Sequence, residues 1–198
     1  MIVHLNGELV EKSPSRVTIE ACGVGYEAFI PLSTFDRLPG AGQHCKLFTY
    51  HAVREDDQIL YGFATPAERD MFTMLLGVSG VGPKLALALL SGMNAGDLQL
   101  AIAQGDSKRL ANVKGVGRKT AERLVVELKD KINPVEAFAN ARTSSSAAQA
   151  EVLRDAMLAL SALGFSDEIA RKNIQRVLEE DPSAADVETI VRRALGGK

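Results

Sequence analysis

The chain has 198 residues, of which 46% are hydrophobic and 24% charged, which is enough for one or two packed domains or three small ones. Its two cysteines, Cys22 and Cys45, are too few for a disulfide framework and lack metal-ligand company, which favours a reducing compartment and a role as core filler. No segment approaches the roughly 18 apolar residues of a membrane span, and the N-terminus has no basic stretch followed by an apolar run, so we expect a soluble, cytoplasmic protein.

The net charge of −2 is distributed unevenly along the chain. Residues 1–63 hold 5 Lys/Arg against 8 Asp/Glu, residues 64–134 hold 10 against 7, and residues 151–198 hold 7 against 9. Only the middle segment is net positive, so it is the expected place of contact with a polyanion such as nucleic acid.

The first domain, residues 1–63, has the composition of short β-strands separated by turns. Its strand-like runs are IVHLNGELVE, RVTIEA, YEAFIP, KLFTYHAV and ILYGF, and Val17 and Ile19 alternate with polar neighbours. Five short strands of this kind favour a small closed barrel. The oligonucleotide/oligosaccharide-binding (OB) barrel is the leading candidate, and a small sandwich is the alternative.

The second domain, residues 64–132, changes to helical periodicity. Thr65 and Glu68 form a capping box around Pro66, which predicts the start of a helix. Further helices are expected at PKLALALLSGM and RKTAERLVVELKDK, with a shorter one through AGDLQLAIAQ. The middle domain is therefore predicted to be all helical.

A duplicated motif dominates this helical domain. GVGPK at 80–84 recurs as GVGRK at 115–119, and Leu75, Val78, Ala86 and Leu89 recur in the same register as Leu110, Val113, Ala121 and Leu124. A single Gly-Val-Gly is more often a plain tight turn, but two register-matched copies that both retain the lysine favour a duplicated functional unit.

The repeated loop has the chemistry of a phosphate-binding turn. Its glycines allow a tight hairpin between helices, the valine points into the helix pair, and free backbone N–H groups of the next helix can hold an anion. Lys84 or Lys119 would lie beside that phosphate, which predicts sequence-independent DNA binding. The candidate DNA-binding residues are Ser79, Gly80, Val81, Gly82, Lys84, Lys114, Gly115, Val116, Gly117, Arg118, Lys119 and Arg123. The second copy is the more basic of the two.

A nucleotide-binding P-loop is disfavoured. That motif needs lysine directly after its last glycine and then Ser or Thr, whereas Pro83 or Arg118 intervenes here and Leu85 occupies the hydroxyl position of the first copy.

Residues 133–150 are rich in Ser, Ala, Asn and Gln and are predicted to form a flexible linker. Residues 151–198 are predicted to form three short helices, with Ser183 capping the third. So small a bundle buries only part of its apolar side chains, and Leu160, Leu163, Phe165 and Leu195 are candidates for an exposed patch that docks a partner. The alternative is that all four belong to the core.

Together, VREDDQILYGF, the two Gly-Val-Gly hairpins and the small helical tail resemble the RuvA family, the Holliday-junction-binding subunits of bacterial RuvAB branch migration complexes. The resemblance implies a multidomain α+β protein with an OB-fold barrel, a tandem helix-hairpin-helix domain and a UBA-like three-helix tail. It also implies a homotetramer, as one tetramer or two facing ones, that holds four-way junction DNA without a cofactor or metal. The implied partners are the hexameric ATPase RuvB, which the tail would bind, and the RuvC resolvase, in DNA recombination, repair and the SOS response.

The stretch REDDQ, residues 54–58, places three carboxylates between two strand-like runs. By itself it favours a solvated hairpin turn. The resemblance implies that Glu55 and Asp56 form an acidic pin beside the junction centre, where their charge repels phosphates. Asp57 would strengthen that repulsion or cap the turn.

Two other classes of function are alternatives to DNA-junction binding. A nuclease or glycosylase needs a catalytic constellation, but His4, His44 and His51 have no evident nucleophile or ligand partners nearby in sequence. A single-strand-binding barrel needs exposed aromatic platforms, but only 5% of residues are aromatic and none is Trp. We therefore expect a binding protein without chemistry of its own.

Overall fold

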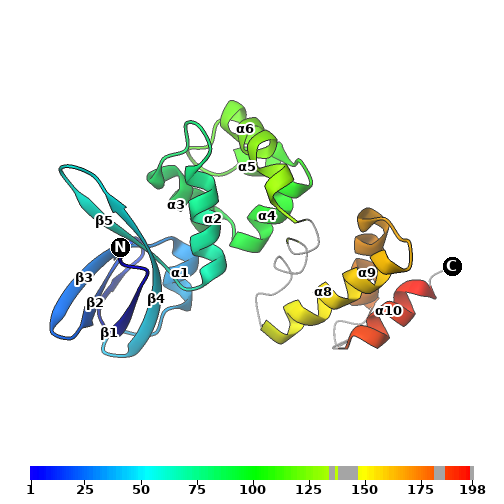
Figure 1. Cartoon of the computed structure of the whole chain (residues 1–198), viewed down its shortest axis with the longest axis horizontal. Helices are drawn as coiled ribbons and strands as arrows, with labels where there is room; N and C mark the ends of the chain where they lie inside the picture. The colour runs from blue at the N-terminus through cyan, green and yellow to red at the C-terminus, as the bar shows by residue number, and fades with distance from the viewer. Residues whose placement is uncertain (134–136, 138–146, 181–185, 197–198) are drawn as a thin grey trace.

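The computed structural model describes residues 1–133, 137, 147–180 and 186–196. Three parts follow one another in chain order: a β-barrel, a helical domain and a helical tail (Figure 1). The mixed α+β class and the three-part organisation expected from the sequence are confirmed.

The barrel is closed by five strands in the order β1-β2-β3-β5-β4. All neighbouring strands are antiparallel except β3 and β5, which are parallel. The strands are β1 (His4–Ser13), β2 (Arg16–Ala21), β3 (Val24–Phe29), β4 (His44–Val53) and β5 (Gln58–Phe63). A single closed sheet fits the OB barrel and rules out the sandwich alternative.

Alternation of side chains fills the barrel, as the sequence predicts. Val17 and Ile19 of β2 are buried while their neighbours are not, because successive side chains of a strand point to opposite faces. Gly7 lets β1 cross closely over β2, since a Cβ there would collide with the carbonyl group of Glu20.

One element of the barrel was not predicted. The short helix α1 (Leu32–Arg37) lies between β3 and β4 and begins after Pro31. Six residues are too few for a helical period to stand out from the surrounding turn sequence, which is why the pattern of LSTFDR did not reveal it.

The helical domain follows β5 after two residues and contains two helical hairpins. Thr65 caps α2 by accepting the N–H of Glu68 at 3.2 Å, which confirms the predicted helix start, while the Glu68 carboxylate accepts the N–H of Ala64 rather than the Thr65 N–H of a standard capping box. Hairpin 1, residues 77–82, joins α2 to α3, and hairpin 2, residues 112–117, joins α5 to α6. The helices are α2 (Pro66–Leu76), α3 (Pro83–Gly92), α4 (Ala95–Ala103), α5 (Ser107–Ala111), α6 (Arg118–Leu128) and the 3₁₀ turn η1 (Lys129–Lys131).

The core of the helical domain extends beyond its predicted limits at residues 64 and 132. Tyr61 and Phe63 of β5 pack into it from the barrel side, and Ala137 is buried in it from the far side. The barrel and the helices therefore share apolar packing rather than meeting only at a chain connection.

The tail is a three-helix bundle of α8 (Ala147–Ala162), α9 (Asp167–Glu180) and α10 (Val187–Leu195). Helix α8 begins at Ala147, inside the segment predicted as a linker, and residues 134–136 and 138–146 of that segment lie outside the described residues. Ser183, the expected cap of the last helix, also lies outside them. Asp186 caps α10 by accepting the N–H of Thr189 at 2.8 Å, and this bond holds the pKa of its carboxyl below the ordinary range.

Within the described residues, no single helix is long and apolar enough to cross a membrane. Helices α3 and α4 together reach that length and composition, but they meet at 97°.

Candidate nucleic-acid interface

Hairpin 1 is a tight turn held by buried apolar contacts. Gly80 adopts φ +85°, a conformation that suits glycine alone. The N–H of Val81 donates to the carbonyl of Val78 at 3.0 Å, and the Val81 side chain is buried between the helices. The hairpin therefore presents backbone rather than its valine to solvent.

Hairpin 2 repeats this geometry residue for residue. Gly115 adopts φ +94°, the N–H of Val116 donates to the carbonyl of Val113 at 3.0 Å, and Val116 is buried. The repeated sequence motif therefore folds into the same local backbone structure in both copies. The inward-pointing valines and the tight turns predicted from the two motifs are both present.

The helices that follow the hairpins begin at open, uncapped termini. Gly82 and Gly117 are the N-cap residues of α3 and α6, and neither helix start receives a side-chain cap. A Cβ at either glycine would meet nothing within 4 Å. Both helix N-termini are therefore accessible to an anion, which the positive end of the helix and its free N–H groups attract.

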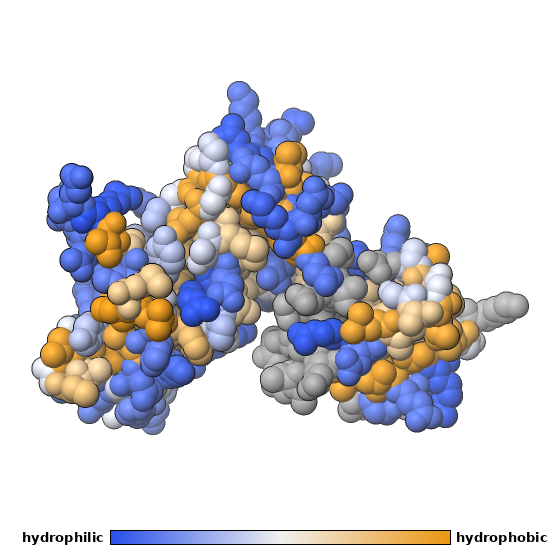
Figure 2. Space-filling model, viewed as in Figure 1, coloured by the Kyte–Doolittle hydropathy of each residue, from blue (hydrophilic) through white to orange (hydrophobic). Residues whose placement is uncertain are grey.

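The predicted polar contact residues lie on the surface of the two hairpin units. Exposed positions are Ser79, Gly80, Gly82, Lys84, Lys114, Gly115, Gly117, Arg118, Lys119 and Arg123. The surface over α6 and the far end of the β4–β5 hairpin are mostly hydrophilic in Figure 2.

Several of the second copy's extra cations already have partners. Arg109 pairs with Asp97 at 3.2 Å, and Arg118 pairs with Glu122 at 2.9 Å. No ion pair within the described residues involves Lys84, Lys114 or Lys119. The greater positive charge that the sequence gives the second copy is therefore partly neutralised, and the lysines are the cations best placed to meet phosphates.

Arg123 connects the two repeats, a role that the sequence does not reveal. Its Nη1 donates to the carbonyl oxygen of Ser79 at 3.0 Å and lies 3.4 Å from the Ser79 hydroxyl oxygen. Ser79 belongs to hairpin 1 and Arg123 to α6. This bond helps to fix the distance between hairpin 1 and α6, and no local motif could have predicted a contact across 44 positions.

Arg109 was not among the candidate DNA-binding residues. With Lys114, Asn112 and Ser91 it lines a groove of about 620 Å³ between the end of α3 and hairpin 2. The sequence shows that Arg109 is one of many basic residues in this domain, but not which of them share a groove.

The three acids of REDDQ lie on the turn between β4 and β5. The N–H of Arg54 donates to the carbonyl of Asp57 at 2.8 Å and closes the turn. Glu55, Asp56 and Asp57 are all exposed, and the β4–β5 hairpin projects away from the barrel (Figure 1). The structure thus provides a protruding, negatively charged tip.

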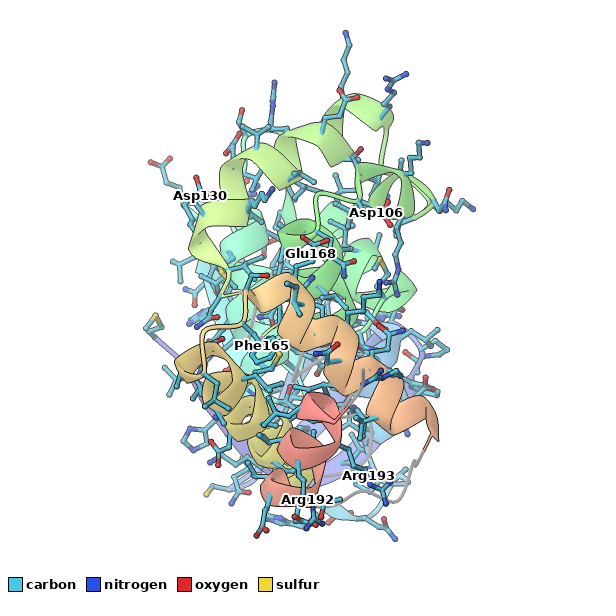
Figure 3. All side chains as sticks on the ribbon, turned by 90° about the vertical axis from the view of Figure 1, so that its right-hand side faces the viewer. Asp106, Asp130, Phe165, Glu168, Arg192 and Arg193 are labelled. Atoms are coloured by element: carbon cyan, nitrogen blue, oxygen red, sulfur yellow. The ribbon has the colours of Figure 1, made fainter. Side chains whose placement is uncertain are left out.

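The four apolar residues singled out in the tail divide into two groups. Leu160 is fully buried in the bundle core, so the expectation that it contributes to an exposed patch is wrong for this structure. Leu163 is 58% exposed and Leu195 46% exposed, while Phe165 is half-buried against the core. Figure 3 shows Phe165 where α8 gives way to α9, with Arg192 and Arg193 of α10 at the other end of the bundle.

No group of three or more His, Cys, Asp or Glu side chains within the described residues could hold a metal ion.

Burial raises the pKa of the Cys45 thiol, which keeps it protonated at neutral pH and a weak nucleophile. Burial also raises the pKa of the Tyr61 hydroxyl, and the smaller charge effects are a lowering by Arg54 and a raising by Asp57.

The barrel aromatics are used for packing rather than displayed as base-stacking platforms. The ring of Phe72 lies 5.1 Å from that of Tyr61, 5.5 Å from Tyr50 and 4.9 Å from Phe63, centroid to centroid. This arrangement weakens the single-strand-binding alternative, which requires exposed rings.

The fold is a closed barrel joined to two matched hairpins, each of which presents an uncapped helix N-terminus and a lysine. These features are typical of proteins that bind the phosphate backbone of nucleic acid. Comparison with known proteins is more specific. Residues 1–62 match the RuvA N-terminal domain, residues 72–130 the SAM-like helix-hairpin-helix tandem, and residues 151–197 the RuvA C-terminal domain. The chain belongs to the RuvA family.

Curated relatives match over almost the entire chain. A protein of Chromobacterium violaceum is 47% identical over 195 residues, covering 98% of this chain and 97% of the relative. Those of Salinibacter ruber and Pseudomonas syringae pv. syringae are each 43% identical, covering 98% and 100% of this chain and 98% and 99% of the relative. All three are named Holliday junction branch migration complex subunit RuvA.

Proposed function

We propose that this protein binds four-way Holliday junction DNA as a homotetramer, holds the junction open and recruits the RuvB ATPase for branch migration in recombination and repair. The observation that carries the proposal is the combination of two matched hairpins, each followed by an uncapped helix N-terminus, with a protruding acidic turn on a barrel that shares apolar packing with the helices. Family membership supports the same conclusion.

The contacts with each DNA arm are expected to be made to its phosphate backbone. A phosphate would lie against the free amides after Gly82 and another against those after Gly117, with Lys84 and Lys119 beside them. Two hairpins that repeat the same turn can straddle a minor groove and hold one phosphate of each strand. Such contacts read no bases, so the complex can move along any sequence.

The acidic turn supplies preference for a junction. Glu55 and Asp56 would lie where four arms meet, and their charge would repel phosphates, oppose closed stacking of the arms and help to separate strands. Asp57 adds a third carboxylate to the same tip, and its carbonyl oxygen also closes the turn.

The tail would dock RuvB, and ATP hydrolysis would belong to that partner. Leu163 and Leu195 are exposed apolar side chains available for docking, and Phe165 is partly exposed two residues after Leu163. RuvC is a further expected partner, one tetramer or two facing tetramers would hold the junction, and the complex would act in the cytoplasm.

The proposal is tested by mobility-shift titration of a four-way junction, a duplex and a single strand of matched length, at several salt concentrations. We expect the junction to bind most tightly and the single strand least. Equal affinity for junction and duplex would contradict the proposal.

The acidic tip is tested by the double variant Glu55→Gln/Asp56→Asn. We expect it to bind every DNA at least as tightly as the unmodified protein, because removal of like charge lowers the electrostatic cost on any DNA shape, and to prefer the junction less. The control Glu20→Gln/Asp36→Asn makes the same charge change at exposed barrel positions and should keep the preference. A folded tip variant that binds all DNA more weakly would contradict the pin assignment.

A further inference from the structure

The acidic turn and hairpin 1 are the two ends of one continuous segment. Strand β5 leads away from the turn, residues 64 and 65 form a bend, and α2 then runs directly to hairpin 1 (Figure 1). Any change of angle at this bend would move the acidic tip relative to the phosphate-binding hairpins. What holds the bend therefore sets where the tip lies on bound DNA.

A buried hydrogen-bond network holds one side of the bend. The N–H of Ala64 donates to Thr34 Oγ1 at 3.0 Å and to Glu68 Oε2 at 3.1 Å, and the Thr34 hydroxyl donates to Glu68 Oε2 at 3.0 Å. Thr34 is 0% exposed and Glu68 2%. The network joins α1 of the barrel, the bend itself and the first turn of α2, and we call it the joint.

The burial of Glu68 exceeds what a helix cap requires. A capping-box glutamate ordinarily satisfies one backbone N–H at a solvated helix start, whereas Glu68 is almost completely buried and its Oε1 has no hydrogen-bond partner among the described residues. Burying a carboxylate costs free energy. That cost is understandable if the carboxylate fixes the angle between two domains as well as capping a helix.

Helix α1 reaches the second helix of the hairpin unit as well. The N–H of Leu32, at the start of α1, donates to Ser91 Oγ at 3.0 Å, and the Ser91 hydroxyl donates to the carbonyl of Leu87 in α3 at 2.7 Å. One short barrel helix thus contacts both helices that flank hairpin 1.

Aromatic packing holds the other side of the bend. Tyr61 and Phe63 of β5 lie against Phe72 of α2, and Tyr50 of β4 packs edge-on against the same ring. Both strands of the acidic hairpin are therefore anchored to α2, in addition to the hydrogen bonds of the joint.

We propose that Thr34 and Glu68 are positioning residues that set the preference for a junction over a duplex, by fixing the acidic tip relative to the two DNA-gripping hairpins. The inference rests on the proposed function. A duplex arm needs only the hairpins, whereas a junction meets the hairpins and the tip together. A looser joint therefore leaves duplex binding intact and lets the tip move away from the junction centre.

The test is Thr34→Val in the full-length protein, which keeps the shape of the side chain and removes the hydroxyl. Thr34→Ser restores the hydroxyl, and Thr73→Val makes the same change at an exposed position of α2 whose hydroxyl bonds only within the helix. Junction and duplex dissociation constants, thermal unfolding, and fluorescence energy transfer between labelled junction arms are measured for each.

We expect Thr34→Val to bind duplex within about twofold of the unmodified protein and to lose about fivefold or more of its junction preference. Energy transfer should report a wider range of arm angles. Thr34→Ser and Thr73→Val should behave like the unmodified protein. An unchanged preference, with or without a lower Tm, overturns the positioning role, as does an equal loss of junction and duplex binding.

If Thr34→Val does not fold, Glu68→Gln loosens the joint itself and Phe72→Leu loosens the aromatic packing at the same bend. Both are judged by the ratio of the duplex to the junction dissociation constant. Failure of the proposed function is distinguishable from failure of this inference. An unmodified protein without junction preference refutes the function, whereas a variant that retains the preference of a junction-selective protein refutes only the role of the joint.

Discussion

At the scale of single residues, the two glycines of each Gly-Val-Gly turn have different physical roles. Gly80 and Gly115 occupy positive φ, where an L-residue is strained. Gly82 and Gly117 have φ of −93° and −80°, which alanine adopts readily, and open space where a Cβ would be. The first glycine of each pair is therefore needed for folding, and the second only for close approach of a ligand to the backbone.

Alanine substitution should separate these roles. Gly80→Ala should lower the free energy of unfolding by about 1–2 kcal/mol. Gly82→Ala and Gly117→Ala should fold normally but bind duplex and junction more weakly, because the methyl group obstructs the phosphate; loss of one charge-assisted contact costs about 1.5 kcal/mol, or roughly tenfold in affinity.

Urea unfolding and DNA titration measure the two effects separately. Gly40→Ala is the control, since its Cβ also meets nothing within 4 Å but lies on the barrel. Normal DNA affinity in both Gly82→Ala and Gly117→Ala would remove the helix starts from the DNA contact.

At the scale of elements, the hairpin units are two copies of one structure that the proposal requires to act together. The lysine of each hairpin should neutralise one phosphate and so release counterions from the DNA. Lys119→Ala should weaken junction and duplex binding alike and make the dependence of log K on log salt shallower by about one, and Lys84→Ala should do the same. The double variant should have a salt slope shallower by about two, because each lysine is expected to contact a phosphate on a different DNA strand.

A salt series on duplex DNA measures these slopes. Lys172→Ala, an exposed tail lysine, is the matched control and should leave the slope unchanged. A double variant whose slope equals that of either single variant would mean that only one hairpin contacts DNA at a time.

At the scale of the whole molecule, the tail is expected to be separable from the DNA grip. Among the described residues of the tail, nine buried side chains from α8, α9 and α10 form a core. A chain ending at residue 146 keeps Ile132 and Ala137, which belong to the core of the helical domain. It should still tetramerise and bind junctions, yet lose RuvB recruitment and ATP-driven branch migration.

Size-exclusion chromatography, junction titration and a branch migration assay with RuvB check these outcomes. Leu163→Asp in the full chain should give the same loss of recruitment without unfolding, since Leu163 is exposed, whereas Leu160→Asp should unfold the tail. Branch migration by the truncated chain would refute the docking role.

The sequence by itself determined the features that depend on near neighbours. Alternation at Val17 and Ile19, the Thr65–Glu68 cap and the matched registers of the two hairpins all follow from periods of two to four residues or from direct repetition. Such patterns can be recognised in the sequence because local backbone geometry sets their spacing. The barrel strands, the start of α2 and the two tight turns with their exposed lysines were predictable for this reason.

Only the tertiary structure decided which distant groups meet. Thr34 donates a hydrogen bond to Glu68, Arg123 donates one to Ser79, and Arg109 pairs with Asp97. Leu160 is buried in the tail core, whereas Leu163 is exposed. Leu160 and Leu163 have the same side chain three residues apart, so composition could not rank them, and burial depends on where α9 and α10 pack. Contacts between elements depend on how the chain folds in three dimensions, and no local period encodes them.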